Sequence, residues 1–366
     1  MYVDGDRERI PYEADAYINQ LGHYAIDADY RMGRRTHEYL LKFPTWPTEW
    51  KQHSIKMAWA DWMWSGDATS IRRYYDLLKE KRHAGFPVLE DGLIVSSGPA
   101  RRGDRDIVDW PLPERDNFEF KKVNAVVNAF YHMNLQELAD MAQALGRKDE
   151  AAKYRAEAVR VRESYERVFY DAARGVYIDG EGCGNASLHA NAAALAFGLV
   201  PSERKGKIAA YLDSRGMACS VYFAQYLLEA YCRAGRADLA VKYMTSTGPR
   251  SWLGMMDFGS TITLEAWNMK AKPNQDLNHA WGSAPLNVIS RFILGVTPLE
   301  SGFRRISVSP QLGGLRRVDA RVPTAMGAVV MSVSNGSLTL ETPAPTQVVW
   351  GGKTYSVKAG KHVFEE

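Results

Sequence analysis

Apolar residues recur at intervals of three and four positions along most of residues 13–294 of this 366-residue chain. This spacing puts them on one face of a helix and predicts a mainly α-helical fold. The clearest segment spans 118–145 and ends at Gly146, a residue suited to a helix C-terminus. The segment 149–169 follows it closely, so the two are expected to pack as an antiparallel helical hairpin.

Hairpins of this kind fill the first 300 or so residues, with about twelve helices in consecutive antiparallel pairs. The other predicted helices span 13–30, 36–42, 55–65, 71–81, 188–198, 203–212, 220–233, 237–244, 261–267 and 285–294. No motif recurs at a fixed period of about 34 or 40 residues, which argues against the common solenoids. We therefore expect a closed double ring of helices, with the functional site at the end where long loops such as 84–117 gather.

The sequence changes character after residue 297. Short alternating segments separated by tight turns, such as Ser334-Asn335-Gly336, predict strands. These strands are expected at 305–310, 328–333, 337–342 and 346–350. Residues 298–366 are therefore predicted to form a small antiparallel β-sandwich domain that caps the helical domain of residues 1–297.

Charge and composition exclude several classes of protein. A net charge of +3 without a run of like charges does not indicate nucleic-acid binding. No apolar run approaches the length of about 18 residues that a membrane span needs. The cysteines are Cys183, Cys219 and Cys232, an odd and widely spaced set that we interpret as buried thiols. The first four residues already carry charge, so no signal peptide is expected, and both cytoplasmic and exported locations stay open.

The first stretch with chemical potential is residues 4–15. It contains five carboxylates, Asp4, Asp6, Glu8, Glu13 and Asp15, interleaved with Arg7 and Arg9. Neighbouring cations, neighbouring acids and burial shift carboxyl pKa values in different directions, so such a cluster can hold acids in different protonation states. The alternative is a solvated helix N-terminus with acids that complement the helix dipole.

A second stretch lies near the end of the helical region. Glu265 is a lone acid in an apolar and aromatic run that includes Trp267. A carboxylate there needs a partner, and His279, two positions before Trp281, is a candidate. The alternative is a Glu–His hydrogen bond in the core.

Two separated acids in unlike surroundings are what inverting glycoside hydrolysis requires. One acid protonates the leaving oxygen, and the other activates a water on the opposite face of the sugar, at a separation of about 6.5–9.5 Å. Tryptophans near the loops suit stacking on sugar rings, although any of them could equally belong to the core. These are Trp59, Trp62, Trp110, Trp252, Trp267 and Trp281.

These motifs resemble the bacterial α-L-rhamnosidases of glycoside hydrolase family 78. The resemblance is carried by Asp4-Gly5-Asp6-Arg7-Glu8-Arg9 with Asp15, by Val108-Asp109-Trp110, and by the segments 261–267 and 278–282. It covers nearly the whole chain but not the upstream modules of such enzymes. It implies an (α/α)6 barrel with a C-terminal β domain, and an exo-acting, inverting enzyme that releases terminal α-L-rhamnose without a metal or cofactor.

The resemblance also implies a role for each matching residue. Glu8 resembles the general acid, which we expect to be buried, and Glu265 resembles the general base. The substrate-binding residues are expected to be Asp4, Arg7, Tyr12, Asp15, Trp59, Asp109, Trp110, Trp267 and His279. Two departures concern the choice of sugar: Tyr12 stands where the family usually has Trp, and Asp4 lies closer to Glu8 than is common. The alternatives are another barrel glycosidase, for instance one acting on uronides, and an inactive carbohydrate-binding fragment.

Overall fold

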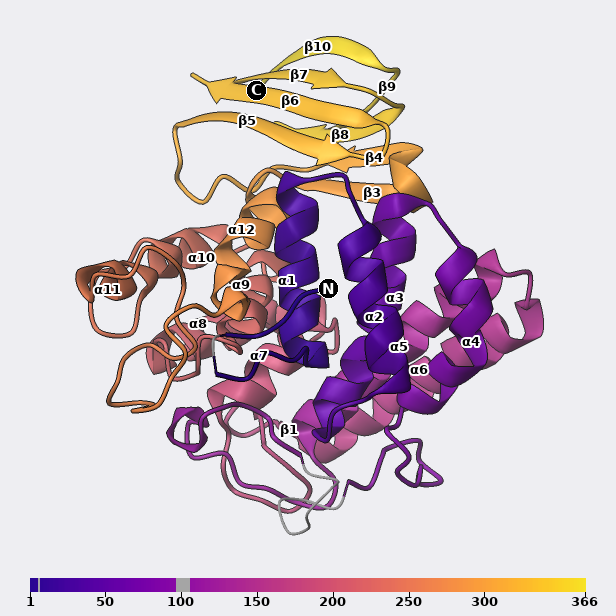
Figure 1. The fold of residues 1–366 in the computed structure, drawn as a ribbon, viewed down its shortest axis with the longest axis vertical. Coiled ribbons are helices and arrows are strands. Elements are labelled where there is room, and N and C mark those ends of the chain that lie inside the picture. The colour runs from indigo at the N-terminus through magenta and orange to yellow at the C-terminus, as the bar shows by residue number, and fades with distance from the viewer. Residues whose placement is uncertain (6, 97–105) are drawn as a thin grey trace.

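The computed structural model describes residues 1–5, 7–96 and 106–366. Six of the described helices form a closed inner ring, in which each helix contacts the next and α12 contacts α1. The ring consists of α1 (Glu13–Ile26), α3 (Thr48–Ser65), α5 (Ala125–Ala144), α7 (Leu188–Ala196), α9 (Ala224–Arg233) and α12 (Ala284–Val288). The predicted (α/α)6 barrel is therefore confirmed (Figure 1).

The connecting helices pack around this ring. They are α2 (Arg31–Lys42), α4 (Thr69–Lys81), α6 (Lys148–Phe169), α8 (Lys205–Arg215) and α10 (Ala237–Met244), followed by the short α11 (Trp252–Asp257). Sequence decides which layer a helix occupies. Every residue of the alanine-rich α7 is buried, as an inner helix requires, whereas α6 buries one stripe and exposes its charged face.

Several predicted helices are wrong in part, and one is wrong in full. Residues 118–124 are not helical, because the Asn124 side chain accepts hydrogen bonds from the amides of Val126 and Val127 and caps α5 there. Residues 261–267 form an irregular loop, because their backbone bonds to the following segment: the Glu265 amide donates to the Asp276 carbonyl.

Residues 296–365, all of which the structure describes, form two four-stranded sheets. One contains β3 (Val296–Glu300), β4 (Arg305–Val308), β8 (Thr346–Trp350) and β9 (Lys353–Val357); the other contains β5 (Arg317–Thr324), β6 (Gly327–Ser334), β7 (Ser337–Thr342) and β10 (Gly360–Glu365). The expected turn joins β6 to β7, with Asn335 and Gly336 both at positive φ. Strand β8 pairs parallel to β4, which corrects the purely antiparallel prediction. Because the chain visits the second sheet between these strands, it has room for the crossover that a parallel pair needs.

The β domain packs on the C-terminal ends of α1 and α3. Gly66, which follows α3, approaches Gly302 so closely that a Cβ at position 66 would lie 2.9 Å from the Gly302 Cα. One apolar core continues across this junction, from Tyr24 and Trp64 of the helices to Phe303 and Val322 of the β domain. The opposite end of the barrel, where the inner helices begin, carries the long loops.

The expected burial of Cys183, Cys219 and Cys232 is confirmed, and all three are free thiols. Within the described part of the chain, no helix combines the length and the apolar character that a bilayer crossing demands.

Candidate active site

A cavity of about 240 Å³ lies where α1, α3 and α12 begin. Its walls come from four parts of the chain that are distant in sequence. The lining residues are Arg7, Glu8, Tyr12, Asp15, Trp46, Trp50, Ile107, Trp110, Glu265, Lys272, Asn274, His279 and Trp281. The structure therefore brings the first acidic stretch and the Glu265 region together, as the ring of hairpins predicts.

The segment before α1 is a tight loop that places Arg7 and Glu8 in the lining of this cavity. The Asp4 amide donates to the Ile10 carbonyl at 3.1 Å, and the Arg9 amide donates to the Asp4 carbonyl at 2.9 Å. The buried Asp4 carboxyl also accepts a hydrogen bond from the Tyr12 amide at 3.1 Å. Asp6 lies outside the described residues.

Glu8 lies at the mouth of the cavity. Its carboxyl accepts a hydrogen bond from the Tyr12 hydroxyl at 3.0 Å and pairs with the Arg7 guanidinium. The side chain is 28 % exposed, so the expected burial of Glu8 is wrong. The loop turns back toward solvent here, and the acid is positioned by Arg7 and Tyr12 instead of by an apolar wall.

Glu265 lies deeper, with a side chain that is 5 % exposed. Lys272 donates to Glu265 Oε1 at 2.6 Å, and the Asp276 amide donates to Oε2 at 2.8 Å. Arg7 Nη2 approaches both oxygens, at 3.3 and 3.4 Å. The predicted partner His279 is wrong, because the ring of His279 faces Asp15. Lys272 and Arg7 thus place two cations beside the carboxylate of the candidate general base.

Arg7 is the link between the two acids. Its guanidinium contacts Glu8 through Nη1 and Glu265 through Nη2. The Arg7 amide also donates to Asp276 Oδ1 at 3.1 Å, which ties the N-terminal loop to the Glu265 loop. The rigid, planar guanidinium therefore contacts both carboxylates at once.

A second polar group, formed by Asp4, Asp15 and His279, lies beside these acids. Asp15 Oδ1 is 3.4 Å from His279 Nε2, and the three residues offer oxygen or nitrogen atoms within 4.8 Å of one another. Burial raises the pKa of both carboxyl groups; the nearby Asp4 raises that of Asp15 further, and the nearby Glu8 raises that of Asp4. Burial, with Lys272 nearby, lowers the pKa of His279 to about 3. The spacing would admit a metal ion, but a raised pKa opposes the deprotonated form that binds a metal, so these carboxyl groups suit sugar hydroxyls better.

Four predicted substrate-binding residues do not line this cavity, and one of them, Asp4, lies beside it in the polar group with Asp15 and His279. Trp59 lies further along α3 and lines a different cavity beside the β domain. The buried Asp109 carboxyl bonds to His189 at 2.6 Å and to the Ser220 amide at 2.8 Å, so it anchors its loop to the beginnings of α7 and α9. Trp267 belongs to the core, where its Nε1 donates to the Cys219 carbonyl at 2.7 Å.

The sequence analysis did not predict several of the residues that line the cavity. Trp46 and Trp50 flank the start of α3, and the Trp50 ring meets the Tyr12 ring edge-on at 5.4 Å. Lys272 and Asn274 lie between the segments 261–267 and 278–282, in a loop without apolar periodicity. The proline-flanked Trp46 was a usable signal, whereas nothing in the sequence marked Lys272 as a partner of Glu265.

The loop before Trp110 is held by a buried acid that the sequence did not indicate. Glu49 accepts hydrogen bonds from the amides of Ile107 and Val108, both at 3.0 Å. Burial and the nearby Asp106 raise the pKa of Glu49 to about 8. The charged run at residues 101–105 lies outside the described residues.

The raised pKa of Glu49 predicts how the free energy of unfolding depends on pH. Its pKa is about 8 in the folded protein against an ordinary 4.5, so between these values the folded state binds more protons than the unfolded state. The free energy of unfolding therefore falls as pH rises in this window. Between pH 7 and pH 8, Glu49→Gln should reduce this fall by about 1 kcal/mol. Urea denaturation at both pH values checks it, with exposed Glu90→Gln as control; equal slopes for parent and Glu49→Gln would contradict it.

The position of Gly5 predicts the effect of a larger side chain in the loop before α1. It has a φ of +48°, and a Cβ there would lie 1.8 Å from Asp276 Oδ2. Gly5→Ala should displace Asp276 and, through it, Arg7, which lowers kcat/KM for a substrate of the site by about tenfold or more. Gly85→Ala is the matched control, because Gly85 also has a positive φ but faces open space. Steady-state kinetics of both variants test the prediction, and equal effects would show that backbone strain alone is responsible.

Comparison with known proteins places this architecture in the class of six-hairpin glycosidase barrels. An α-L-rhamnosidase structure from Aspergillus terreus superimposes with a TM-score of 0.80 at 17 % identity, over 98 % of this chain and 45 % of that one. A Streptomyces avermitilis α-L-rhamnosidase complexed with L-rhamnose gives 0.78 at 16 % identity, over 99 % of this chain and 39 % of that one. At these identities the likeness concerns the fold.

The family model for the bacterial alpha-L-rhamnosidase 6 hairpin glycosidase domain matches residues 1–293, so the chain belongs to that family. This confirms the resemblance seen in the sequence motifs. A curated α-L-rhamnosidase from Formosa agariphila is 25 % identical over 316 residues, which is 81 % of this chain and 32 % of that protein. The chain thus spans about a third of the length of this relative.

Proposed function

We propose that this chain carries the catalytic site of an inverting, exo-acting α-L-rhamnosidase, a glycoside hydrolase that removes terminal α-L-rhamnose. The observation that carries the proposal is the pair of carboxylates, Glu8 and Glu265, on either side of Arg7 in one aromatic-walled cavity. The family membership and the relatives named α-L-rhamnosidase support the choice of sugar.

In the proposed reaction the two acids act on opposite faces of the sugar. Glu8 donates its proton to the glycosidic oxygen as the bond to the anomeric carbon breaks. Arg7 then stabilises the Glu8 carboxylate that remains. Glu265, held by Lys272, takes a proton from the water that attacks the anomeric carbon. Inversion requires the two carboxyl groups to lie about 6.5–9.5 Å apart, whereas retention requires them to lie about 5–5.5 Å apart.

The remaining polar groups are assigned to substrate binding. Asp4, Asp15 and His279 form the buried group that would bind sugar hydroxyls, and Trp50 and Trp110 supply apolar walls. Arg7 and Lys272, the two cations among the described residues that line the cavity, already contact Glu265. A neutral deoxy sugar therefore fits better than a uronide, whose carboxylate would compete for these cations.

The stereochemical course tests the mechanism. Incubation with an aryl α-L-rhamnoside, followed at once by ¹H NMR, should show β-L-rhamnose as the first sugar formed, before mutarotation. Initial release of α-L-rhamnose would contradict the water-activating role of Glu265. Rhamnose binding by calorimetry without any hydrolysis would instead favour the inactive carbohydrate-binding fragment.

A further inference from the structure

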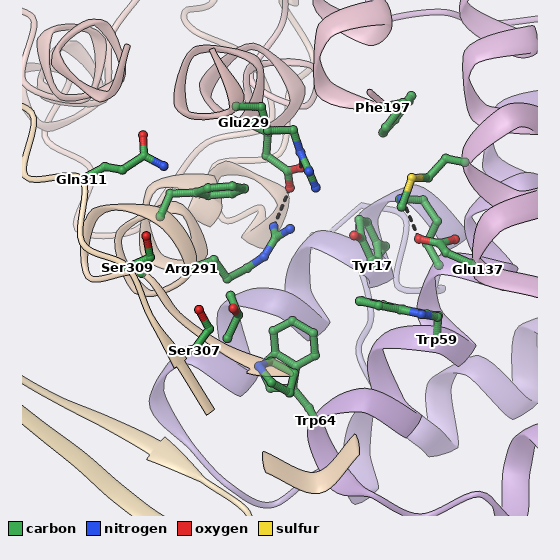
Figure 2. Close-up of a pocket in the computed structure, with 17 residues that line it drawn as sticks. Tyr17, Trp59, Trp64, Glu137, Phe197, Glu229, Arg291, Ser307, Ser309 and Gln311 are labelled. Carbon is green, nitrogen blue, oxygen red and sulfur yellow. Dashed lines mark hydrogen bonds and ion pairs between the residues drawn. The ribbon is translucent and has the colours of Figure 1, made fainter. Parts of the chain in front are cut away.

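A larger cavity, of about 310 Å³, lies at the other end of the barrel, where the β domain closes the inner ring (Figure 2). The inner helices α1, α3, α5 and α9 contribute to its walls, as do Phe197 after α7, the turn Ile289–Ile293 after α12, and strands β3 and β4. The contributions from the helical ring include Tyr17, Lys56, Glu137, Phe197, Glu229 and Arg291. None of these residues lines the Glu8 cavity.

Buried charge sets this cavity apart from an ordinary core. Lys56 Nζ is 3.0 Å from Glu137 Oε1, with side chains 5 % and 3 % exposed. Arg291 pairs with Glu229, with side chains 12 % and 5 % exposed. Apolar residues of similar volume are often as stable as a buried ion pair, so stability alone does not account for two such pairs in one cavity.

The polar groups here require both donors and acceptors from an occupant. Among the described residues, Glu137 Oε2 and Gln311 Oε1 are buried without a hydrogen-bond partner. Arg291 uses the same nitrogen, Nη1, for its hydrogen bonds to Glu229 and Asn287, so its other nitrogens can still donate. A hydroxyl group both donates and accepts, whereas a simple anion would leave the two buried oxygens unsatisfied.

Aromatic rings and hydroxyls complete the wall. Figure 2 shows Ser307, Ser309 and Gln311 on one side of the cavity and Trp59 on the other, with Trp64 below. Rings interspersed with hydrogen-bonding groups match a sugar, which has apolar ring faces and polar edges.

Local geometry also marks this end of the barrel. Arg291 lies in a π-helical turn, Ile289–Ile293, and such turns occur often at functional sites. Arg233, at 39 % side-chain exposure, lies where the cavity meets solvent. An occupant could therefore enter from solvent past Arg233.

We infer that this cavity is a second carbohydrate site, which binds one neutral, hexose-sized sugar unit between the barrel and the β domain. Glu137 and Gln311 accept from its hydroxyls, Arg291 donates to them, and Trp59 and Trp64 supply apolar wall. The site is separate from the catalytic cavity and does not depend on the function proposed there.

Calorimetric titration of the full chain with L-rhamnose, and separately with D-glucose, tests this site. With a sugar that also enters the catalytic cavity, two molecules should bind per chain. Ser307→Phe fills the second cavity and should remove one of the two binding events. Gln311→Ala removes one acceptor and should weaken that event about fivefold. Ser356→Phe is the matched control, because Ser356 is exposed on β9 of the same sheet.

The two proposals fail in different ways. If Ser307→Phe and Gln311→Ala leave the binding of both sugars unchanged, the second site is overturned and the catalytic proposal stays intact. The same holds if no sugar binds beyond the catalytic cavity. Asp15→Asn should remove only the event at the catalytic cavity. An inactive chain that still loses a binding event with Ser307→Phe would overturn the catalytic proposal and keep the second site.

Discussion

Replacing Glu265 by glutamine is expected to lower kcat for an aryl α-L-rhamnoside by about 10²- to 10⁴-fold, the range typical of a general base. Glutamine keeps the shape of the side chain and one acceptor for Lys272, but it cannot take a proton from water. Because the base acts on the attacking water, the loss should be similar for good and poor leaving groups. KM should change little, since Glu265 contacts Lys272, Arg7 and the Asp276 amide.

Azide separates this role from a structural one. It attacks without needing deprotonation, so added azide should restore turnover of Glu265→Gln and yield the inverted β-glycosyl azide. Glu90→Gln, at an exposed position, should leave kcat unchanged. A folded Glu265→Gln protein with parental kcat would contradict the assignment, and so would one that azide cannot rescue.

Replacing Glu8 by glutamine is expected to give a loss that depends on the leaving group. A glycoside with an alkyl or sugar leaving group needs proton donation, and its kcat/KM should fall by about 10²- to 10⁴-fold. The 2,4-dinitrophenolate group leaves without such help, so kcat/KM for a 2,4-dinitrophenyl rhamnoside should fall far less. Steady-state kinetics over a series of leaving groups measure the difference.

The Glu8 experiment has its own control. Tyr12→Phe removes the hydroxyl that contacts Glu8 but keeps the carboxyl group, so its loss should be smaller than that of Glu8→Gln on the poor leaving groups. An equal loss of Glu8→Gln on every leaving group would rule out proton donation by Glu8.

Regular elements were the most predictable part of the fold. Helix α10 was predicted at its observed bounds, and α6 began one residue before its predicted start. Periodicity fails where the backbone bonds to another loop, as at residues 261–267, or where a side chain caps a helix late, as Asn124 does. The parallel pairing of β4 with β8 depends on strands nearly 40 residues apart, which local patterns do not encode.

For the site, the motifs named two acids that the structure places in one cavity, but they misjudged some of the neighbouring residues. Trp50 and Trp59 lie on the same helix, nine positions and about 14 Å apart, so they reach opposite ends of the barrel. Nothing in their local sequence says which end holds the acids. Lys272 and Arg7 replaced the expected His279 as partners of Glu265, because that choice depends on the path of an irregular loop.

The contact between Arg7 and Asp276 constrains how this protein can change over time. It joins two loops separated by 269 positions, and Gly5 leaves just enough room for it. A substitution at position 5, 7 or 276 therefore disturbs both loops, and its effect depends on which residues occupy the other two positions. Related chains should vary at these three positions in concert, and a graft of either loop alone into a relative should fail where a graft of both succeeds.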